Sequence, residues 1–85
     1  MAKKIKIELR ALGRRRALGL SWPAERRMAV DIAAHAGDEK ALLDTIAHEV
    51  AHIASRNDFS ESACERMAGD LSDVLWRMGW RRVNL

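Results

Sequence analysis

Hydrophobic and polar residues alternate along the first third of the chain and follow a helical spacing in the rest. Residues 4–9 place an apolar side chain at every second position between charged ones, which is typical of a half-buried strand. Residues 27–33 repeat this alternation, and residues 17–22 form a shorter candidate strand. These segments predict a small antiparallel sheet of about three strands.

Two segments in the second half have the apolar spacing of amphipathic helices. The first runs from Ala41 to Ala54, and Asp38 before it is suited to cap the first turn. The second begins near Asp58 to Ser60, and its apolar positions recur every three or four residues. A small sheet packed on two main helices is an α+β fold, and residues 1–85 are expected to form one domain.

The first helix carries the run His48-Glu49-Val50-Ala51-His52, which is H-E-x-x-H. Two histidines four residues apart lie one helical turn apart, so both imidazoles can reach one ion. Neutral imidazole is a good Zn²⁺ ligand, and the intervening glutamate falls beside the metal. Glu49 is therefore the candidate general base, and His48 and His52 are the candidate ligands of Zn²⁺. The alternative is a pair of surface histidines on an ordinary amphipathic helix.

A catalytic zinc site needs a third protein ligand, and we expect it on the second helix. Glu61 lies on the same face of that helix as its apolar residues. Burying a carboxylate on such a face costs free energy unless the carboxylate is paired or bound to a metal. It is the candidate third ligand, although it also fits a capping box with Asp58 as the N-cap. Glu65, one turn later, either accepts a hydrogen bond from a ligating histidine or faces solvent.

Several segments around these residues resemble known zinc peptidases. H-E-x-x-H on one helix and Glu61 on the next resembles the gluzincin arrangement. The likeness extends to ImmA/IrrE-type metallopeptidases and to very short phage and prophage proteins of similar layout. The segments that carry it are Leu43-Asp44-Thr45-Ile46-Ala47-His48-Glu49-Val50-Ala51-His52, Ser60-Glu61-Ser62-Ala63, Glu61-x-x-Cys64-Glu65-x-Met67-Ala68 and Asp70-Leu71-Ser72-Asp73-Val74-Leu75-Trp76-Arg77-Met78-Gly79-Trp80-Arg81.

The resemblance implies a zinc metallopeptidase in which the strand at residues 27–33 holds an extended peptide substrate over the metal. The alternative is an ordinary edge strand blunted by its arginines. Peptidases of this kind commonly stabilise the oxyanion with Tyr, His or Arg, and this chain contains no Tyr. His35 or an arginine near Arg27 is the expected substitute. The interval between His52 and Glu61 is short, so the loop between them is too short to form much of the wall of a substrate cleft.

The positive charge of the chain suggests a second class of partner, nucleic acid. The net charge is +3, the isoelectric point is about 9.6, and basic clusters are spread along the chain. Such a surface can bind phosphate backbones weakly, so nucleic acid is a candidate partner, although solubility alone also accounts for the charge. We expect Trp22 to fill the core, and Trp76 and Trp80 to cover a helix end or form a self-association patch.

The remaining features favour a soluble protein of the cytoplasm. The single Cys64 cannot form an internal disulfide, and its place on an apolar stripe predicts a buried side chain. No apolar run is long enough for a transmembrane helix, so no membrane association is expected. The N-terminal segment is basic but lacks the apolar region of a signal peptide.

Three functions remain open on sequence grounds. The first is a zinc-dependent peptidase or amide hydrolase acting on a peptide or protein. The second is a non-catalytic, zinc-stabilised binding module with the same fold. The third is a small basic nucleic-acid accessory protein in which H-E-x-x-H is incidental. The sequence leaves the substrate and the oligomeric state undetermined.

Overall fold

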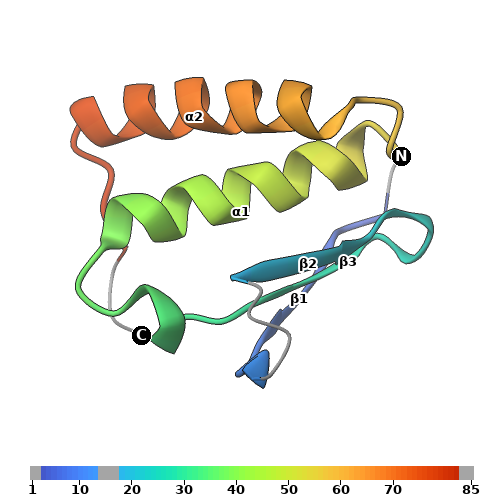
Figure 1. The fold of residues 1–85 in the computed structure, drawn as a ribbon, viewed down its shortest axis with the longest axis horizontal. Helices are drawn as coiled ribbons and strands as arrows, with labels where there is room; N and C mark the ends of the chain where they lie inside the picture. The colour runs from blue at the N-terminus through green and yellow to red at the C-terminus, as the bar shows by residue number, and fades with distance from the viewer. Residues whose placement is uncertain (1–2, 14–17, 83–85) are drawn as a thin grey trace.

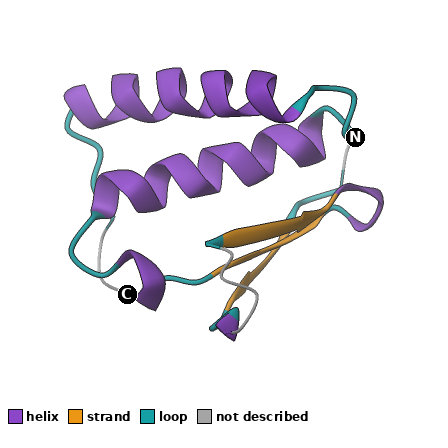
Figure 2. Ribbon diagram, viewed as in Figure 1, coloured by secondary structure: helices purple, strands orange, loops and turns teal. Residues whose placement is uncertain are grey.

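The computed structural model describes residues 3–13 and 18–82, so the first residue of the predicted second strand lies outside the described residues. The chain forms two layers of helix over a layer of sheet, with α1 between α2 and the strands (Figures 1 and 2). The elements are β1 (Lys6–Leu9), β2 (Gly19–Trp22), η2 (Pro23–Glu25), β3 (Arg27–Val30), η3 (Ala33–His35), α1 (Glu39–Ala54) and α2 (Glu61–Arg77).

The sheet is mixed, with strand order β1-β3-β2. β2 runs antiparallel to β3, whereas β1 runs parallel to it. The predicted α+β class, with three strands and two main helices, is confirmed, but the prediction of a wholly antiparallel sheet is wrong. Alternation of apolar residues shows which face of a strand is buried, and this pattern is the same for either strand direction.

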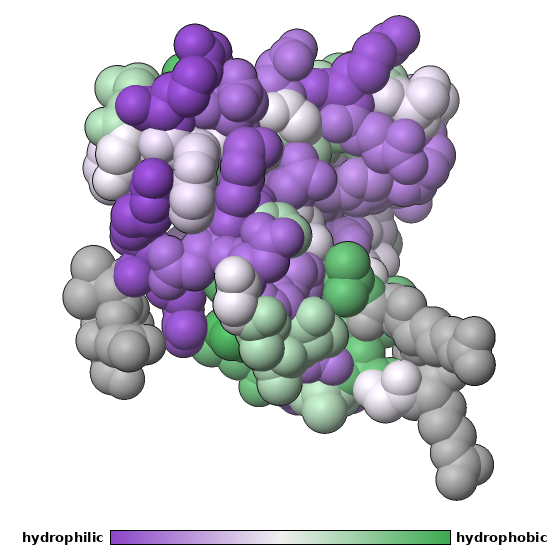
Figure 3. Space-filling model, turned by 60° about the vertical axis from the view of Figure 1, so that its left-hand side comes forward, coloured by the Kyte–Doolittle hydropathy of each residue, from purple (hydrophilic) through white to green (hydrophobic). Residues whose placement is uncertain are grey.

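The core lies between β3 and the inner face of α1. Met28 and Val30 of β3 pack with Leu42 and Ile53 of α1, and all four side chains are buried. Ala29 is also fully buried, because β3 is the central strand and both of its faces are covered. On the face drawn in Figure 3, hydrophilic residues dominate the helical layers and hydrophobic residues gather toward the sheet.

Each long helix begins at a side-chain cap. Asp38 accepts a hydrogen bond from the Ala41 amide at 2.9 Å, as predicted for α1. At α2 the cap is Ser60, whose hydroxyl accepts from the Ala63 amide at 3.1 Å. The capping box of Asp58 and Glu61 is therefore wrong: Glu61 is the first residue of the helix, two positions before the residue that a capping box would use.

Side-chain hydrogen bonds join the two helices and hold the loops beside the sheet. Ser72 of α2 donates a hydrogen bond to the Asp44 carboxylate of α1 at 3.0 Å, and Ser72 is fully buried. Below α1, the Asp31 carboxylate accepts the amides of Leu12 and Ala34 at 3.0 and 3.1 Å. These backbone donors lower the pKa of Asp31, the Leu12 amide having the larger effect.

Of the three tryptophans, Trp22 lies nearer the surface than predicted. Trp22 is half-buried and stacks against the Arg27 guanidinium at 3.8 Å from its ring centre, so it does not fill the core. The Arg81 guanidinium lies over the Trp76 ring, 3.4 Å from the ring centre, and Trp80 is exposed. Trp76 and Trp80 line an apolar hollow of about 570 Å³ between β1, α1 and the end of α2.

No helix within residues 3–13 and 18–82 combines the length and hydropathy needed to cross a membrane.

Candidate metal centre

Three candidate ligand atoms meet where the end of α1 approaches the start of α2. The Nε2 atoms of His48 and His52 lie 3.1 Å apart. Glu61 places one carboxylate oxygen 2.6 Å from His48 Nε2 and the other 3.0 Å from His52 Nε2. The structure thus brings together the three residues that the sequence proposes as ligands.

A tight turn between the helices produces this convergence. Arg56 and Asn57 adopt left-handed backbone conformations, with φ of 54° and 62°, and the Asn57 amide donates to the His52 carbonyl at 3.0 Å. The chain therefore reverses within one turn of His52, which places Glu61 at the first position of the next helix. Asparagine tolerates this conformation better than most residues.

The donor set fits a divalent metal such as zinc. Two imidazole nitrogens and one carboxylate form the ligand set of many catalytic zinc sites. Ligands of a tetrahedral zinc ion, at about 2.0–2.1 Å from the metal, lie about 3.3 Å from one another, close to the separations found here. The histidine side chains are 19 % and 14 % exposed, whereas Glu61 is 65 % exposed, so the site opens to solvent on the Glu61 side.

Cys64 contacts the far side of one candidate ligand. Its sulfur lies 3.5 Å from His52 Nδ1 and is fully buried. Burial, with a smaller effect from the charges of Glu61 and Glu49, raises the pKa of the thiol, so Cys64 is protonated at neutral pH. When His52 Nδ1 carries the ring proton and donates a hydrogen bond to the Cys64 sulfur, Nε2 is free to bind a metal.

Glu65 was expected either to contact a ligating histidine or to face solvent, and the structure shows the second. Glu65 is exposed on α2, and its side chain makes no hydrogen bond or ion pair within the described part of the chain. Cys64, one residue earlier, has the contact instead. The signal was present in the sequence, because Cys64 follows Glu61 by three residues and so shares its helical face.

Glu49 follows His48 on α1 and does not belong to the group of three candidate ligands. It is 8 % exposed on α1, and its side chain packs against Gly19 of β2. A Cβ atom at Gly19 would lie 2.9 Å from Glu49 Oε2 and 2.8 Å from Thr45 Cγ2. A glycine is needed here because both helix side chains occupy the space of a β-carbon.

We expect Gly19→Ala to destabilise the fold, because it forces Glu49 and Thr45 to move within a packed contact. Such overpacking typically costs about 1–3 kcal/mol, measurable by urea denaturation. Gly69→Ala is the control, since nothing lies within 4 Å of its added carbon on α2. That change should be neutral or stabilising. Equal stability of Gly19→Ala and the wild type would show that Glu49 does not pack against β2 in solution.

His35 is buried beneath α1, and both ring nitrogens have partners. Nδ1 lies 2.7 Å from the Asp31 carbonyl and Nε2 lies 2.8 Å from the Thr45 hydroxyl. A carbonyl only accepts, so Nδ1 carries the proton and Nε2 accepts from Thr45. In this arrangement His35 offers no free N–H to an oxyanion; it fixes Thr45, one turn before Glu49 on α1.

The strand predicted to hold a substrate is not at an edge. β3, which forms the first part of the predicted strand at residues 27–33, has β1 on one side and β2 on the other. β3 therefore cannot accept an added peptide strand. The edge beside the candidate site belongs to β2, through the contact of Gly19 with Glu49.

Comparison of the chain with protein-family models, with curated proteins and with solved structures finds no match.

Proposed function

We propose that this chain is a zinc-dependent amide hydrolase that cleaves peptide bonds. The observation that carries the proposal is the meeting of His48, His52 and Glu61 at mutual distances of 2.6–3.1 Å, with Glu49 adjacent and outside the group. Zinc is the metal we favour, because two imidazoles and a carboxylate suit it better than Mg²⁺ or Ca²⁺, which prefer oxygen ligands.

Each residue of the site has a distinct role in this proposal. His48, His52 and Glu61 hold Zn²⁺, which when bound polarises a carbonyl and lowers the pKa of a water. Glu49 accepts a proton from the attacking water and returns it to the leaving amine. Cys64 orients His52 by accepting a hydrogen bond from its Nδ1–H, and His35 steadies α1 through Thr45.

The edge of β2 supplies a surface for an extended peptide. The Leu18 carbonyl accepts a hydrogen bond from the Asp31 amide. The backbone N–H and C=O groups that face β3 are therefore those of Leu18, Leu20 and Trp22. The backbone groups of Gly19 and Ser21 consequently point away from β3, beside Glu49. A substrate that pairs with them adopts the extended form that places its backbone over the site.

A second candidate function is a metal-stabilised binding module without catalysis. Two observations favour it: the chain has no Tyr, and both nitrogens of His35 are engaged within the fold. Such a module keeps the metal and the β2 edge and lacks a donor for the oxyanion. Hydrolysis by the metal-loaded protein separates the two functions.

Metal binding is tested by dialysing the protein against a chelator and adding zinc back. We expect about one Zn²⁺ per chain and a melting temperature that rises with zinc. A free concentration 100 times the dissociation constant stabilises the fold by about 2.7 kcal/mol, which shifts the melting temperature of a small domain by roughly 10–20 °C. The double variant His48→Ala/His52→Ala should show neither effect. Absence of both in the wild type would exclude the hydrolase and the metal-stabilised module.

A further inference from the structure

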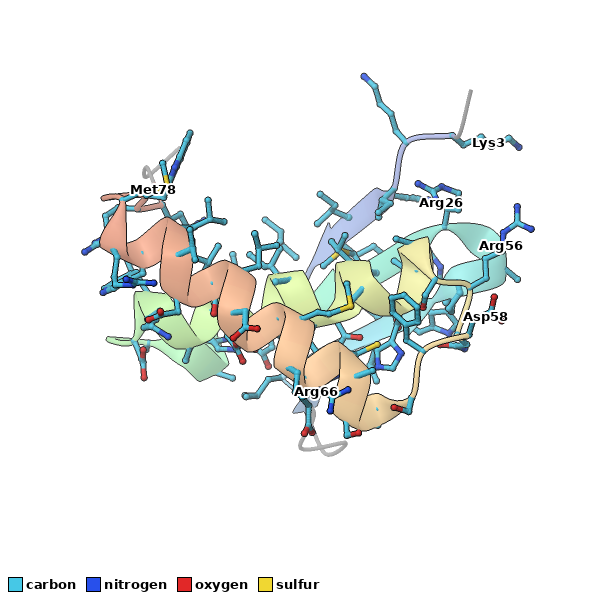
Figure 4. The ribbon with its side chains drawn as sticks, turned by 90° about the horizontal axis from the view of Figure 1, so that it is seen from above. Lys3, Arg26, Arg56, Asp58, Arg66 and Met78 are labelled. Carbon is cyan, nitrogen blue, oxygen red and sulfur yellow. The ribbon has the colours of Figure 1, made fainter. Side chains whose placement is uncertain are left out.

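A second hollow lies at the far end of β2, beyond the candidate metal centre. Its volume is about 700 Å³, and it is formed where the turn after β2 meets the turn after α1. The residues that line it are Ser21, Trp22, Pro23, Ala24, Glu25, Arg26, Arg56 and Asn57. Figure 4 shows Arg26 and Arg56 at this end of the molecule, with Lys3 beside them.

The hollow carries unbalanced positive charge. Arg26 and Arg56 line it, and within the described residues neither has a carboxylate within 4 Å. Glu25, which also lines it, is held by Arg27 at 2.8 Å. Asp58 lies at the same end of the molecule (Figure 4). Two arginines line this recess, and guanidinium groups are suited to bind a carboxylate with paired hydrogen bonds.

The backbone at both arginines is held in a turn, and a hydrogen bond also holds the Arg26 side chain. Arg26 has a φ of 47°, its amide donates to the Pro23 carbonyl at 3.1 Å, and its side-chain Nε donates to the Lys3 carbonyl at 2.7 Å. Arg56 has a φ of 54° in the turn tied to His52. A positive φ is uncommon at residues other than glycine, and such residues concentrate at ligand sites.

The hollow is in line with the candidate metal centre. β2 runs from Gly19, which touches Glu49, to Trp22, which lines the hollow, and three residues of strand span about 10 Å. Arg56 follows His52 by four residues and lies in the turn after α1. A peptide extended along β2 over the site therefore reaches the hollow with a side chain three or four residues from the cleaved bond.

We propose that this hollow is a specificity site for an acidic side chain of the substrate. Resting on the proposed function, the inference narrows the substrate class to peptides with Asp or Glu three or four residues from the cleaved bond. Arg26 and Arg56 bind the carboxylate, while the backbone of Gly19 and Ser21 pairs with the intervening residues. Phosphate groups of a nucleic acid are the competing ligand for the same charges.

The test uses a series of fluorescent peptides that carry one Glu at each position in turn, with a Gln-containing twin for each. Binding is measured by anisotropy to zinc-loaded Glu49→Gln protein, and cleavage is measured with the wild type. We expect one Glu position, three or four residues from the cleaved bond, to bind and react about 10-fold better than its Gln twin. In the double variant Arg26→Gln/Arg56→Gln this preference should disappear. The single variant Arg56→Lys, which keeps Arg26 and a positive charge at position 56, should retain part of it.

Arg66→Gln is the matched control, because Arg66 is an exposed arginine of α2 that does not line the hollow. It should keep the full preference for Glu. Equal binding of all Glu and Gln twins would overturn the inference even when cleavage is observed. A preference for Glu in binding without any cleavage would leave the site in place and reject the hydrolase. Single-stranded oligonucleotide that binds through the two arginines, with no difference between peptide twins, would assign the hollow to nucleic acid.

Discussion

Zinc-loaded Glu49→Gln should retain its metal and its fold and lose its hydrolytic activity. The amide has the same shape as the carboxylate but lacks the basic oxygen, and Glu49 does not belong to the ligand group. A positioned general base typically contributes about 10²–10⁴-fold to the rate, so we expect a loss of that size in kcat/KM. Metal analysis, thermal melting and cleavage of a peptide library measure the three properties separately.

Glu65→Gln is the control for this experiment. It makes the same chemical change on an exposed glutamate of α2, one turn after the third candidate ligand, and should leave the rate unchanged. Activity of Glu49→Gln within a few-fold of the wild type would reject Glu49 as the base. If neither the wild type nor the variant cleaves any peptide although both bind zinc, the binding-module function becomes the better account.

Glu61→Gln should weaken zinc binding by more than about 100-fold, because it removes one of three protein ligands; loss of an outer partner alone costs about 10–100-fold. The amide keeps the length of the side chain, so the change separates metal binding from helix packing. In the absence of zinc the variant should melt close to the wild type, since Glu61 is 65 % exposed and Ser60 caps the helix. Isothermal titration with zinc measures the first effect, and melting of the metal-free proteins measures the second.

Asp58→Asn provides the comparison, because Asp58 carries a carboxylate near the start of α2 and does not belong to the ligand group. It should bind zinc as the wild type does. Unchanged zinc affinity in Glu61→Gln, together with a loss in Asp58→Asn, would move the third ligand to Asp58.

Local spacing in the sequence accounts for most of what was predicted correctly. The period of apolar residues located both helices, and the four-residue interval of His48 and His52 placed them on one face of α1. Glu61 was proposed from its place on the stripe of the second helix, and the structure brings it to the histidines. These inferences concern positions within one helix or across one short turn, where the geometry depends on few contacts.

The errors in the sheet concern contacts between segments that are distant in the sequence. Strand direction and strand order depend on which distant segments pair, and alternation carries no information on either. The pairing of β1 with β3 made the strand before the motif central and moved the usable edge to β2. Nothing in the local pattern around Gly19 indicates that it faces Glu49, because the need for a glycine there arises from α1.

The turn at Arg56 and Asn57 has a consequence for the order in which this protein assembles. All three candidate ligands lie within residues 48–61, so closing the metal site requires a loop of about a dozen residues, whose entropy cost is small. The position of the Glu49 side chain depends on its contact with Gly19, thirty residues away in the sequence. That contact requires the sheet, which contains a parallel pair of strands, and parallel pairing forms slowly. If the proposed function holds, a newly made chain would therefore close the pair of helices that carries the candidate ligands before Glu49 reaches its place against β2, and the candidate site would be complete only when the whole fold has formed.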